Sequence, residues 1–264
     1  MAAPVSVSDI IAASTAGKSQ TIRFEADQDS VSINLGCWYN ARSNSGGNTG
    51  RFVTPTTVAV PVANALGSLR YKEAASGTRL YVLSGGIGGR EAFTDPAPGA
   101  VYFYDRLLHI GGLDGTLTSA QTVGGTLTRN TGGVGNRIYF EIYTMLGTAE
   151  TTITASYTNQ DGTSGRTTRP AHVGGTNEFA PNDFYQAWEL MLQAGDTGVQ
   201  SVEDVTLAAS TGTAGNFGIA IVRPICQFPV DGAGGIFDGT LGLKEIPWLE
   251  PGTCLSFYMA ALNN

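Results

Sequence analysis

Apolar and polar side chains alternate along several short stretches in the second half of the chain. Residues 137–145 show the pattern best, because apolar side chains occupy every second position from Ile138 to Ile142. A period of two residues is typical of a β-strand with one buried face. Similar patterns predict further strands at 101–106, 151–158, 185–192, 200–208 and 216–226. Glycine-rich turns separate these strands, at intervals typical of a β-sandwich or jelly roll.

The first half of the chain contains shorter apolar patterns. Strands are predicted at 21–25, 31–35, 51–60 and 79–84. A long loop rich in Asn, Ser and Gly occupies 40–50. One helix is predicted at 61–69, since Pro61 stands at its start and four apolar side chains then fall on one face. A single helical turn is expected at 10–13.

These elements divide the chain around a soft boundary at the Pro- and Gly-rich residues 95–99. Residues 1–20 are expected to form an N-terminal arm and 21–99 a small β-rich part. Residues 100–226 are expected to form the β-sandwich domain, and 227–264 a segment that wraps around it. The expected fold class is therefore mainly β, with a β-sandwich, jelly-roll-like C-terminal part and extended termini.

Composition favours a folded protein. The chain has 264 residues and 36 glycines, a share of glycine that disorder would also explain. Only 14% of the residues are charged, however, and 9% are aromatic, so apolar surface is available for a core. Glycine then serves the many turns of a β protein.

The distribution of charged and apolar residues argues against a nucleic-acid-binding protein and against a membrane helix. The formal net charge is −7, and Lys and Arg lack the clusters that binding to nucleic acid requires. No apolar run reaches the roughly 18 residues of a membrane helix, and the N-terminus does not resemble a signal peptide. Cys37, Cys226 and Cys254 are expected to be buried, inert thiols, although one disulfide and one free thiol would also fit their number.

No catalytic, cofactor or metal motif is complete. Residues 16–20 look like part of a phosphate loop but lack its first glycine, and residues 85–90 follow a strand without opening a helix. No Gly-x-Ser-x-Gly elbow occurs, and 159–163 has too few carboxylates for a calcium loop. We expect no catalytic residues, no cofactor, no metal and no enzymatic activity.

The two histidines and the aromatic residues have structural explanations. His109 follows an apolar strand, and a structural imidazole bonded to a turn carbonyl is expected there rather than a base. His172 is expected to lie in an exposed loop. A core role is favoured over a sugar-binding platform for the aromatic residues Tyr102, Phe103, Tyr104, Tyr139, Tyr143 and Tyr157.

Carboxylates and arginines indicate no catalytic pair. Glu141 and Glu189 lie on predicted strands, where we expect them to be solvated. The adjacent Glu203 and Asp204 are expected to point to opposite faces of a strand, so no pair at glycosidase spacing is indicated. Two alternatives, solvation or an ion pair with a neighbouring subunit, stay open for Arg42, Arg51, Arg166 and Arg169.

Several sequence segments of the predicted sandwich resemble tailed-bacteriophage virion proteins. They are YDRLLHIGGLDGTLTSAQTV (104–123), EIYTMLGT (141–148), ASYTNQDGTSGRTT (155–168), LQAGDTGVQSVE (192–203) and GTAGNFG (212–218). The resemblance covers residues 100–224 and leaves 1–99 and 225–264 outside it. Proteins of this group are structural and have no assigned reaction. The resemblance therefore implies a component of a phage particle and no catalytic residues.

The expected elements narrow the kind of component. A coat protein of the common phage fold needs a long helix and a terminase needs a phosphate loop, so a capsid decoration (cement) protein on the outer head surface is favoured. Its expected partners are the major capsid protein and copies of itself, with a trimer favoured, and neither nucleic acid nor a membrane. We expect it in the virion, assembled in the host bacterial cytoplasm. The alternative is a tail or fibre module that binds a receptor or glycan.

Overall fold

The computed structural model describes residues 8, 11–12, 15–16, 37–38, 56–65, 68–76, 79–82, 84–87, 99–175, 187–230, 235–238 and 247–261. The chain is mainly β and contains several antiparallel sheets, which confirms the predicted fold class. In the part that the structure describes, no helix is long and apolar enough to cross a membrane.

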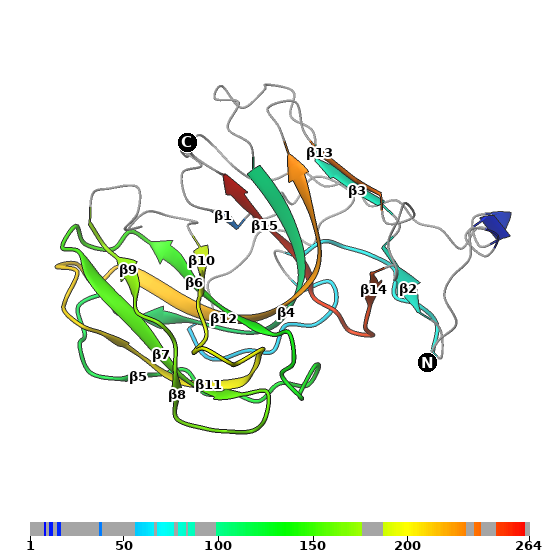
Figure 1. Ribbon diagram of the computed structural model, residues 1–264. Coiled ribbons are helices and arrows are strands. Elements are labelled where there is room, and N and C mark those ends of the chain that lie inside the picture. Colours follow the sequence, from blue (N-terminus) through cyan, green and yellow to red (C-terminus); the bar gives the residue numbers. More distant parts are fainter. Residues whose placement is uncertain are drawn as a thin grey trace.

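Two antiparallel sheets form the body of the molecule (Figure 1). The larger contains, in order, β1 (Cys37–Trp38), β15 (Leu255–Ala261), β4 (Gly99–Leu113), β12 (Asn216–Val230), β6 (Arg137–Thr144) and β10 (Ala187–Leu190). The smaller contains β5 (Gln121–Thr122), β11 (Val199–Leu207), β7 (Thr151–Asn159) and β8 (Arg166–Thr167), with β9 (Ala171–Val173) also paired to β7. Four of the predicted strands thus become β6, β7, β11 and β12 with small shifts of their ends.

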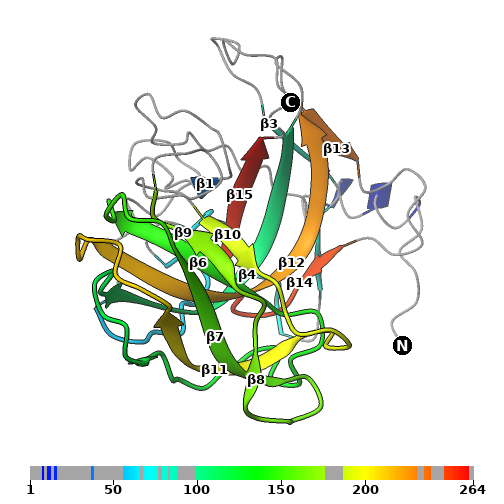
Figure 2. The same ribbon diagram turned by 60° about the vertical axis from the view of Figure 1, so that its left-hand side comes forward.

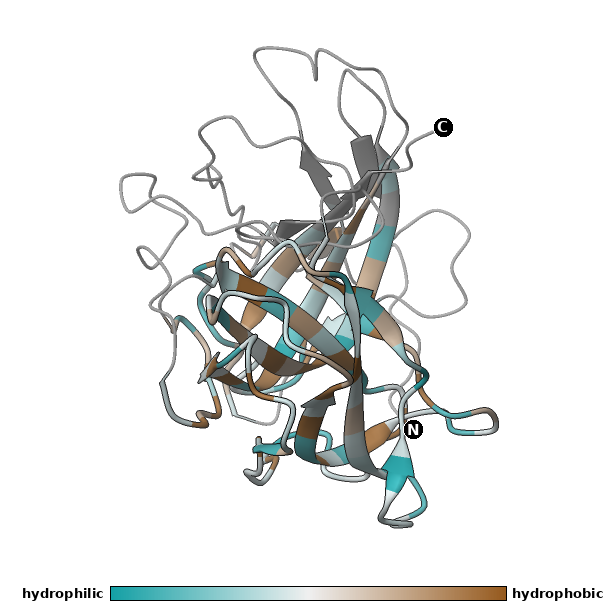
Figure 3. Cartoon of the chain, turned by 90° about the vertical axis from the view of Figure 1, so that its left-hand side faces the viewer, coloured by the Kyte–Doolittle hydropathy of each residue, from teal (hydrophilic) through white to brown (hydrophobic). Residues whose placement is uncertain are grey.

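The alternation in the sequence explains how the two sheets pack. Ile138, Phe140 and Ile142 on β6 are fully buried, as are Ile153 and Tyr157 on β7. These side chains belong to one apolar cluster that lies between the sheets. Figure 3 shows the resulting change between hydrophobic and hydrophilic positions along the strands. Two sheets packed face to face around this core form a β-sandwich.

Strand β11 departs from simple alternation. Its buried valines, Val199, Val202 and Val205, recur every third residue, because two shifts in its register with β7 each insert one extra residue. The second shift lies at Glu203. Its carboxylate accepts hydrogen bonds on the outer face of the sheet, where Asp204 also lies opposite Ser156. The prediction that Glu203 and Asp204 point to opposite faces is therefore wrong, and the bulge is the reason.

The described strands of the N-terminal part pair with strands near the C-terminus. β1 pairs with β15, β2 (Leu80–Tyr81) with β14 (Trp248–Leu249), and β3 (Ser84–Ile87) with β13 (Gly235–Asp238). Figure 2 shows β15, β4 and β12 side by side, with β3 and β13 beyond the end of the sheet. The two ends of the chain thus depend on each other for their hydrogen bonds.

The helix predicted at 61–69 is wrong for its described residues. Residues 63–64 form a turn, in which Ala65 N donates to Val62 O, and Ser68 N donates to Ala65 O. Asn64 has φ of 62°, which a right-handed helix does not allow. Ile11 and Ala12 are helical, in agreement with the helical turn expected at 10–13. The predictions for 21–25, 31–35 and 40–50 lie outside the described residues, as does the 51–55 part of the strand predicted at 51–60. The described part of that strand, 56–60, forms only an isolated bridge between Ala59 and His109.

Candidate functional site

One of the two longest strands of the large sheet, β4, contains two adjacent charged residues within an apolar sequence. Asp105 and Arg106 lie near the middle of β4, and their exposed fractions are 2% and 3%. Neighbouring residues of a strand point to opposite faces. A buried charge requires a partner because desolvation without one is costly. Each of the two residues accordingly forms an ion pair on its own face of the sheet.

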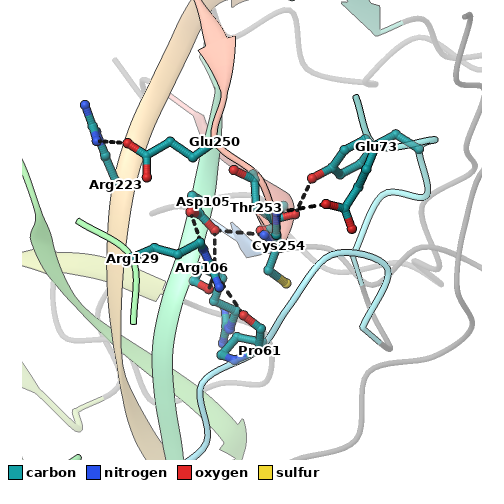
Figure 4. A network of polar contacts seen from close by, with 12 residues as sticks. Pro61, Glu73, Asp105, Arg106, Arg129, Arg223, Glu250, Thr253 and Cys254 are labelled. Atoms are coloured by element: carbon teal, nitrogen blue, oxygen red, sulfur yellow. Dashed lines mark hydrogen bonds and ion pairs between the residues drawn. The ribbon is translucent and has the colours of Figure 1, made fainter. Parts of the chain in front are cut away.

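On one face, Asp105 binds Arg129, which precedes β6 (Figure 4). Arg129 Nε and Nη2 donate to the two carboxylate oxygens at 2.9 and 2.8 Å. Arg129 Nη2 also lies 2.9 Å from Pro61 O, and the backbone N–H of Cys254 donates to Asp105 Oδ1 at 2.8 Å. This carboxylate–guanidinium pair therefore holds four distant segments of the chain together.

The turn before β15 has further anchors, also drawn in Figure 4. Tyr71 Oη donates to Thr253 O at 2.8 Å, and Gly252 N donates to Glu73 at 3.0 Å. Arg223 on β12 pairs with Glu250 at 3.0 Å. The 71–73 segment and the turn at 250–254 are thereby fixed to each other.

On the opposite face, Arg106 forms a bidentate ion pair with Glu141 of β6. The Arg106 side chain reaches across β12 to do so. Arg106 Nη1 donates to Glu141 Oε1 at 2.7 Å, and Arg106 Nη2 donates to Oε2. Tyr143 Oη donates to Glu141 Oε2 at 2.6 Å, and Arg106 Nε donates to His109 Nδ1 at 2.9 Å. A register shift next to Leu107 places Arg106 and His109 on the same face.

Burial sets the protonation states of this cluster. The pKa of His109 is lowered to about 3, first by burial and then by the positive charge of Arg106. His109 is therefore neutral at pH 7, and its Nδ1 is the unprotonated nitrogen that accepts from Arg106. Burial and the Glu141 carboxylate raise the pKa of Tyr143 well above its ordinary value. Neither side chain is suited to exchange protons near neutral pH.

The structure corrects two predictions for this cluster. Glu141 was expected to be solvated, but only 1% of it is exposed, because its face of the sheet is covered and Arg106 compensates its charge. His109 is a buried structural imidazole that lies within β4 rather than after a strand, and Arg106 is one of its partners.

Tyrosines pack beside the Arg106–Glu141 pair on the same face. Tyr102 and Tyr139 have ring centroids 5.8 and 5.4 Å from that of Tyr258, and Tyr104 stacks on Tyr139 at 6.3 Å. They belong to a cluster with buried small residues of β12 and β10. This packing agrees with the core role favoured for these aromatic residues.

A third ionic cluster lies at the end of the sandwich where β6 begins. Asp196 accepts hydrogen bonds from Arg166 Nε at 2.9 Å, Tyr157 Oη at 2.5 Å and Asn159 Nδ2 at 2.8 Å. The hydrogen bond from Arg166, followed by that from Tyr157, lowers the pKa of Asp196 to about 2. Arg166 thus pairs within its own chain. Asn159 Oδ1 accepts from the backbone of Asp161, so 159–163 forms a plain turn.

The other predicted residues are scattered. His172 is exposed as expected but lies on β9, 2.8 Å from Glu150. Glu189 is half-buried and lies 3.2 Å from Arg137, and burial raises its pKa. Arg169 is exposed. Arg42 and Arg51 lie outside the described residues.

The thiols are protected by burial. Cys226 and Cys254 are both free, and burial raises the pKa of their thiols to about 12 and about 11. Cys254 is buried and Cys226 is partly buried. The side chain of Cys37 lies outside the described residues. Among the residues that the structure describes, no group of three or more His, Cys, Asp or Glu side chains is placed to hold a metal ion.

The site therefore consists of two buried ion pairs that hold segments of the chain together: Arg106–Glu141 connects β4 with β6, and Asp105–Arg129 connects β4 with the segment before β6. Sequence reasoning missed the pairs, although a charged dipeptide inside an apolar strand was a visible signal. In comparisons with known proteins, no family model, no curated protein and no solved structure matched the chain.

Proposed function

We propose that the protein is a structural component of a bacteriophage particle and acts as a capsid decoration (cement) protein without catalysing a reaction. The observation that carries the proposal is the presence of two buried ion pairs, Asp105–Arg129 and Arg106–Glu141, whose charged groups hold segments of the chain together. The sequence segments that resemble phage virion proteins support a role in a phage particle. They lie along the same sandwich, mainly on β4, β6, β7, β11 and β12.

Such a protein acts by adding contact area between coat subunits. A sandwich with fixed side chains loses little conformational freedom on binding, so more of its contact energy stabilises the shell. The partners are the major capsid protein and further copies of this chain in a homotrimer. The proposed location is the virion, on the outer surface of the head.

The test uses phage heads made without this protein. Purified full-length protein is mixed with the heads, and we expect it to sediment with them and to raise their melting temperature, since a ligand of the folded shell stabilises it. Immunogold labelling of complete particles is expected to mark the whole head. Label confined to the tail tip, with no binding to heads, would overturn the proposal and favour a receptor- or glycan-binding module.

A further inference from the structure

Two segments of the N-terminal part, 69–73 and 79–82, lie against the segment 247–255, and the three together are called the cover layer. Leu69 N donates to Leu255 O at 2.7 Å, and β2 pairs with β14. The inward side chains of the cover layer belong to one apolar cluster with β4: Leu69, Tyr71, Leu80, Val82 and Leu249, with Val101 and Phe103 of β4. Figure 1 shows β2 and β14 on the side of the molecule away from β7, β8 and β11. The outer side of the cover layer faces away from the large sheet.

Exposed cations lie on this outer side. Leu69 and Tyr71 are buried, whereas Arg70 and Lys72 are exposed, because side chains of an extended segment alternate between its two sides. Arg79, directly before β2, is exposed as well. The three cations are separated along the sequence, and the fold gathers them on one layer.

Two aromatic side chains share the outer side. Tyr81 of β2 and Trp248 of β14 are directly opposite each other in the register, and both are partly exposed. Their neighbours Leu80 and Leu249 face the apolar cluster, so Tyr81 and Trp248 point away from it. The guanidinium carbon of Arg79 lies 4.2 Å from the centre of the Trp248 ring, which makes a cation–π contact. Trp, Tyr and Arg are the residues most enriched among those that dominate protein interfaces.

The arginines of the cover layer differ from most other described arginines in their partners. Elsewhere, several arginines pair with a carboxylate: Arg106, Arg129, Arg137, Arg166 and Arg223. In the part of the chain that the structure describes, neither Arg70 nor Arg79 forms an ion pair. Of the described carboxylates in the layer, Glu250 is paired with Arg223, and Glu73 accepts a backbone N–H. The outer side is therefore locally positive in a chain whose formal net charge is −7.

We propose that the outer side of the cover layer docks onto an acidic surface of another protein. Arg70 and Arg79 face the carboxylates of that surface, and Trp248 and Tyr81 supply the apolar contact. The inference deepens the proposed function and rests on it for the identity of the partner, the major capsid protein. Complementary charge steers such a partner and fixes its orientation, and the aromatic rings add buried area.

An acidic protein suits this surface better than a nucleic acid or an identical surface. Proteins that bind nucleic acid often neutralise about 6–10 phosphates, more than Arg70, Lys72 and Arg79 can. Two copies that met symmetrically through this side would bring Arg70 and Arg79 against like charges. Carboxylates of a different protein surface avoid both difficulties.

Charge-reversing variants test the docking surface. Arg70→Glu and Arg79→Glu are compared with Arg169→Glu, which makes the same change at an exposed arginine of the sandwich. Each full-length protein is titrated onto phage heads made without it, and sedimentation gives the dissociation constant at low and high salt. Near-UV circular dichroism reports whether each variant is folded. We expect each test variant to raise the dissociation constant about tenfold, with a weaker salt dependence, and the control to bind like the wild type.

A second readout does not need heads. A dye-labelled peptide of consecutive glutamates serves as the acidic probe, and its fluorescence anisotropy is measured with the same proteins at low salt. Heparin and duplex DNA are compared as competitors. We expect the wild type and Arg169→Glu to bind the peptide despite their negative net charge, and Arg70→Glu and Arg79→Glu to bind it at least about tenfold more weakly.

The outcomes separate this inference from the proposed function. Undiminished binding of both test variants to heads would refute the docking surface and leave the decoration role standing. Peptide binding through Arg70 and Arg79, without any binding of the wild type to heads, would support an acidic protein partner and refute the decoration role. Equal weakening by Arg169→Glu, tighter binding of heparin or DNA than of the peptide, or oligomers that dissociate only in the test variants would overturn the inference.

Discussion

The buried imidazole of His109 predicts that the protein loses stability in mild acid. His109 is neutral in the folded state because burial and the neighbouring Arg106 lower its pKa to about 3. In the unfolded chain the ring has its ordinary pKa of 6.5 and binds a proton as the pH falls below that value. Proton binding lowers the free energy of the unfolded state and leaves that of the folded state unchanged. The stabilising contribution of a neutral His109 is therefore complete above pH 6.5 and is lost progressively as the pH falls towards about 3.

The magnitude follows from proton linkage. Each pH unit below 6.5 changes the free energy of unfolding by about 1.4 kcal/mol while the folded ring stays neutral. Between pH 7.5 and pH 5 the loss from His109 is about 2 kcal/mol. The other titrating groups contribute equally to the wild type and to a variant that lacks only this histidine. The difference between the two proteins therefore isolates the imidazole.

The variant is His109→Asn, whose amide oxygen can accept from Arg106 in place of Nδ1. The matched control is His172→Asn, because His172 is the other histidine of the chain and is exposed. Urea unfolding is followed by tryptophan fluorescence at both pH values. Trp188, whose ring lies 4.5 Å from that of Phe140 in the core, reports loss of packing.

We expect the wild type and the His172 control to lose about 2 kcal/mol more between pH 7.5 and pH 5 than His109→Asn does. Equal losses in all three proteins would refute the reasoning, since they would show that His109 takes up a proton in the folded state. A loss of stability that is seen in the wild type and in His109→Asn but is absent in His172→Asn would show that His172, and not His109, causes the pH dependence.

Three further predictions concern buried contacts in the folded protein. Glu141→Gln leaves the buried Arg106 without a counter-charge, so urea unfolding should show a loss of about 3–5 kcal/mol, and a loss below about 1 kcal/mol would contradict the role of the pair. Gly147→Ala places a methyl group 1.8 Å from a carbonyl oxygen and should cost at least about 2 kcal/mol in the same assay, whereas Gly132→Ala, which meets open space, should change stability by less than about 0.5 kcal/mol. The buried thiol of Cys254 should resist iodoacetamide in the folded protein at pH 8 and react in urea, as mass spectrometry can establish; rapid modification of the folded protein would show that the thiol is accessible.

The sequence predicted strands better than it predicted what their outer faces contact. Alternation located β6 and β7 because one side of each strand faces the sandwich core. The same alternation placed Glu141 on the other side, which is normally solvated. A pattern along one strand contains no information on whether a further layer covers that side. The burial of Glu141 follows from long-range packing, which the local sequence does not encode.

Irregular backbone was the second source of error. The spacing of Val199, Val202 and Val205 by three residues is unusual for a strand, and it was a signal of the two bulges in β11. Without the bulges, Glu203 and Asp204 would face opposite sides. At 61–69 the apolar pattern suited a helix, but Asn64 adopts a left-handed conformation and its side chain accepts from Tyr71 N. A local polar contact there outweighs a weak helical preference.

The position of Asp105 next to Arg106 has a geometric consequence for the whole fold. Since adjacent residues of a strand face opposite ways, this dipeptide places a negative charge on one face of β4 and a positive charge on the other. Arg129 and Glu141 are each available on only one of those faces. A shift of β4 by one residue would bury both charges against the wrong partners, at a cost of several kcal/mol for each unpaired ion. The two ion pairs therefore select one register for the strand on which the N- and C-terminal segments assemble.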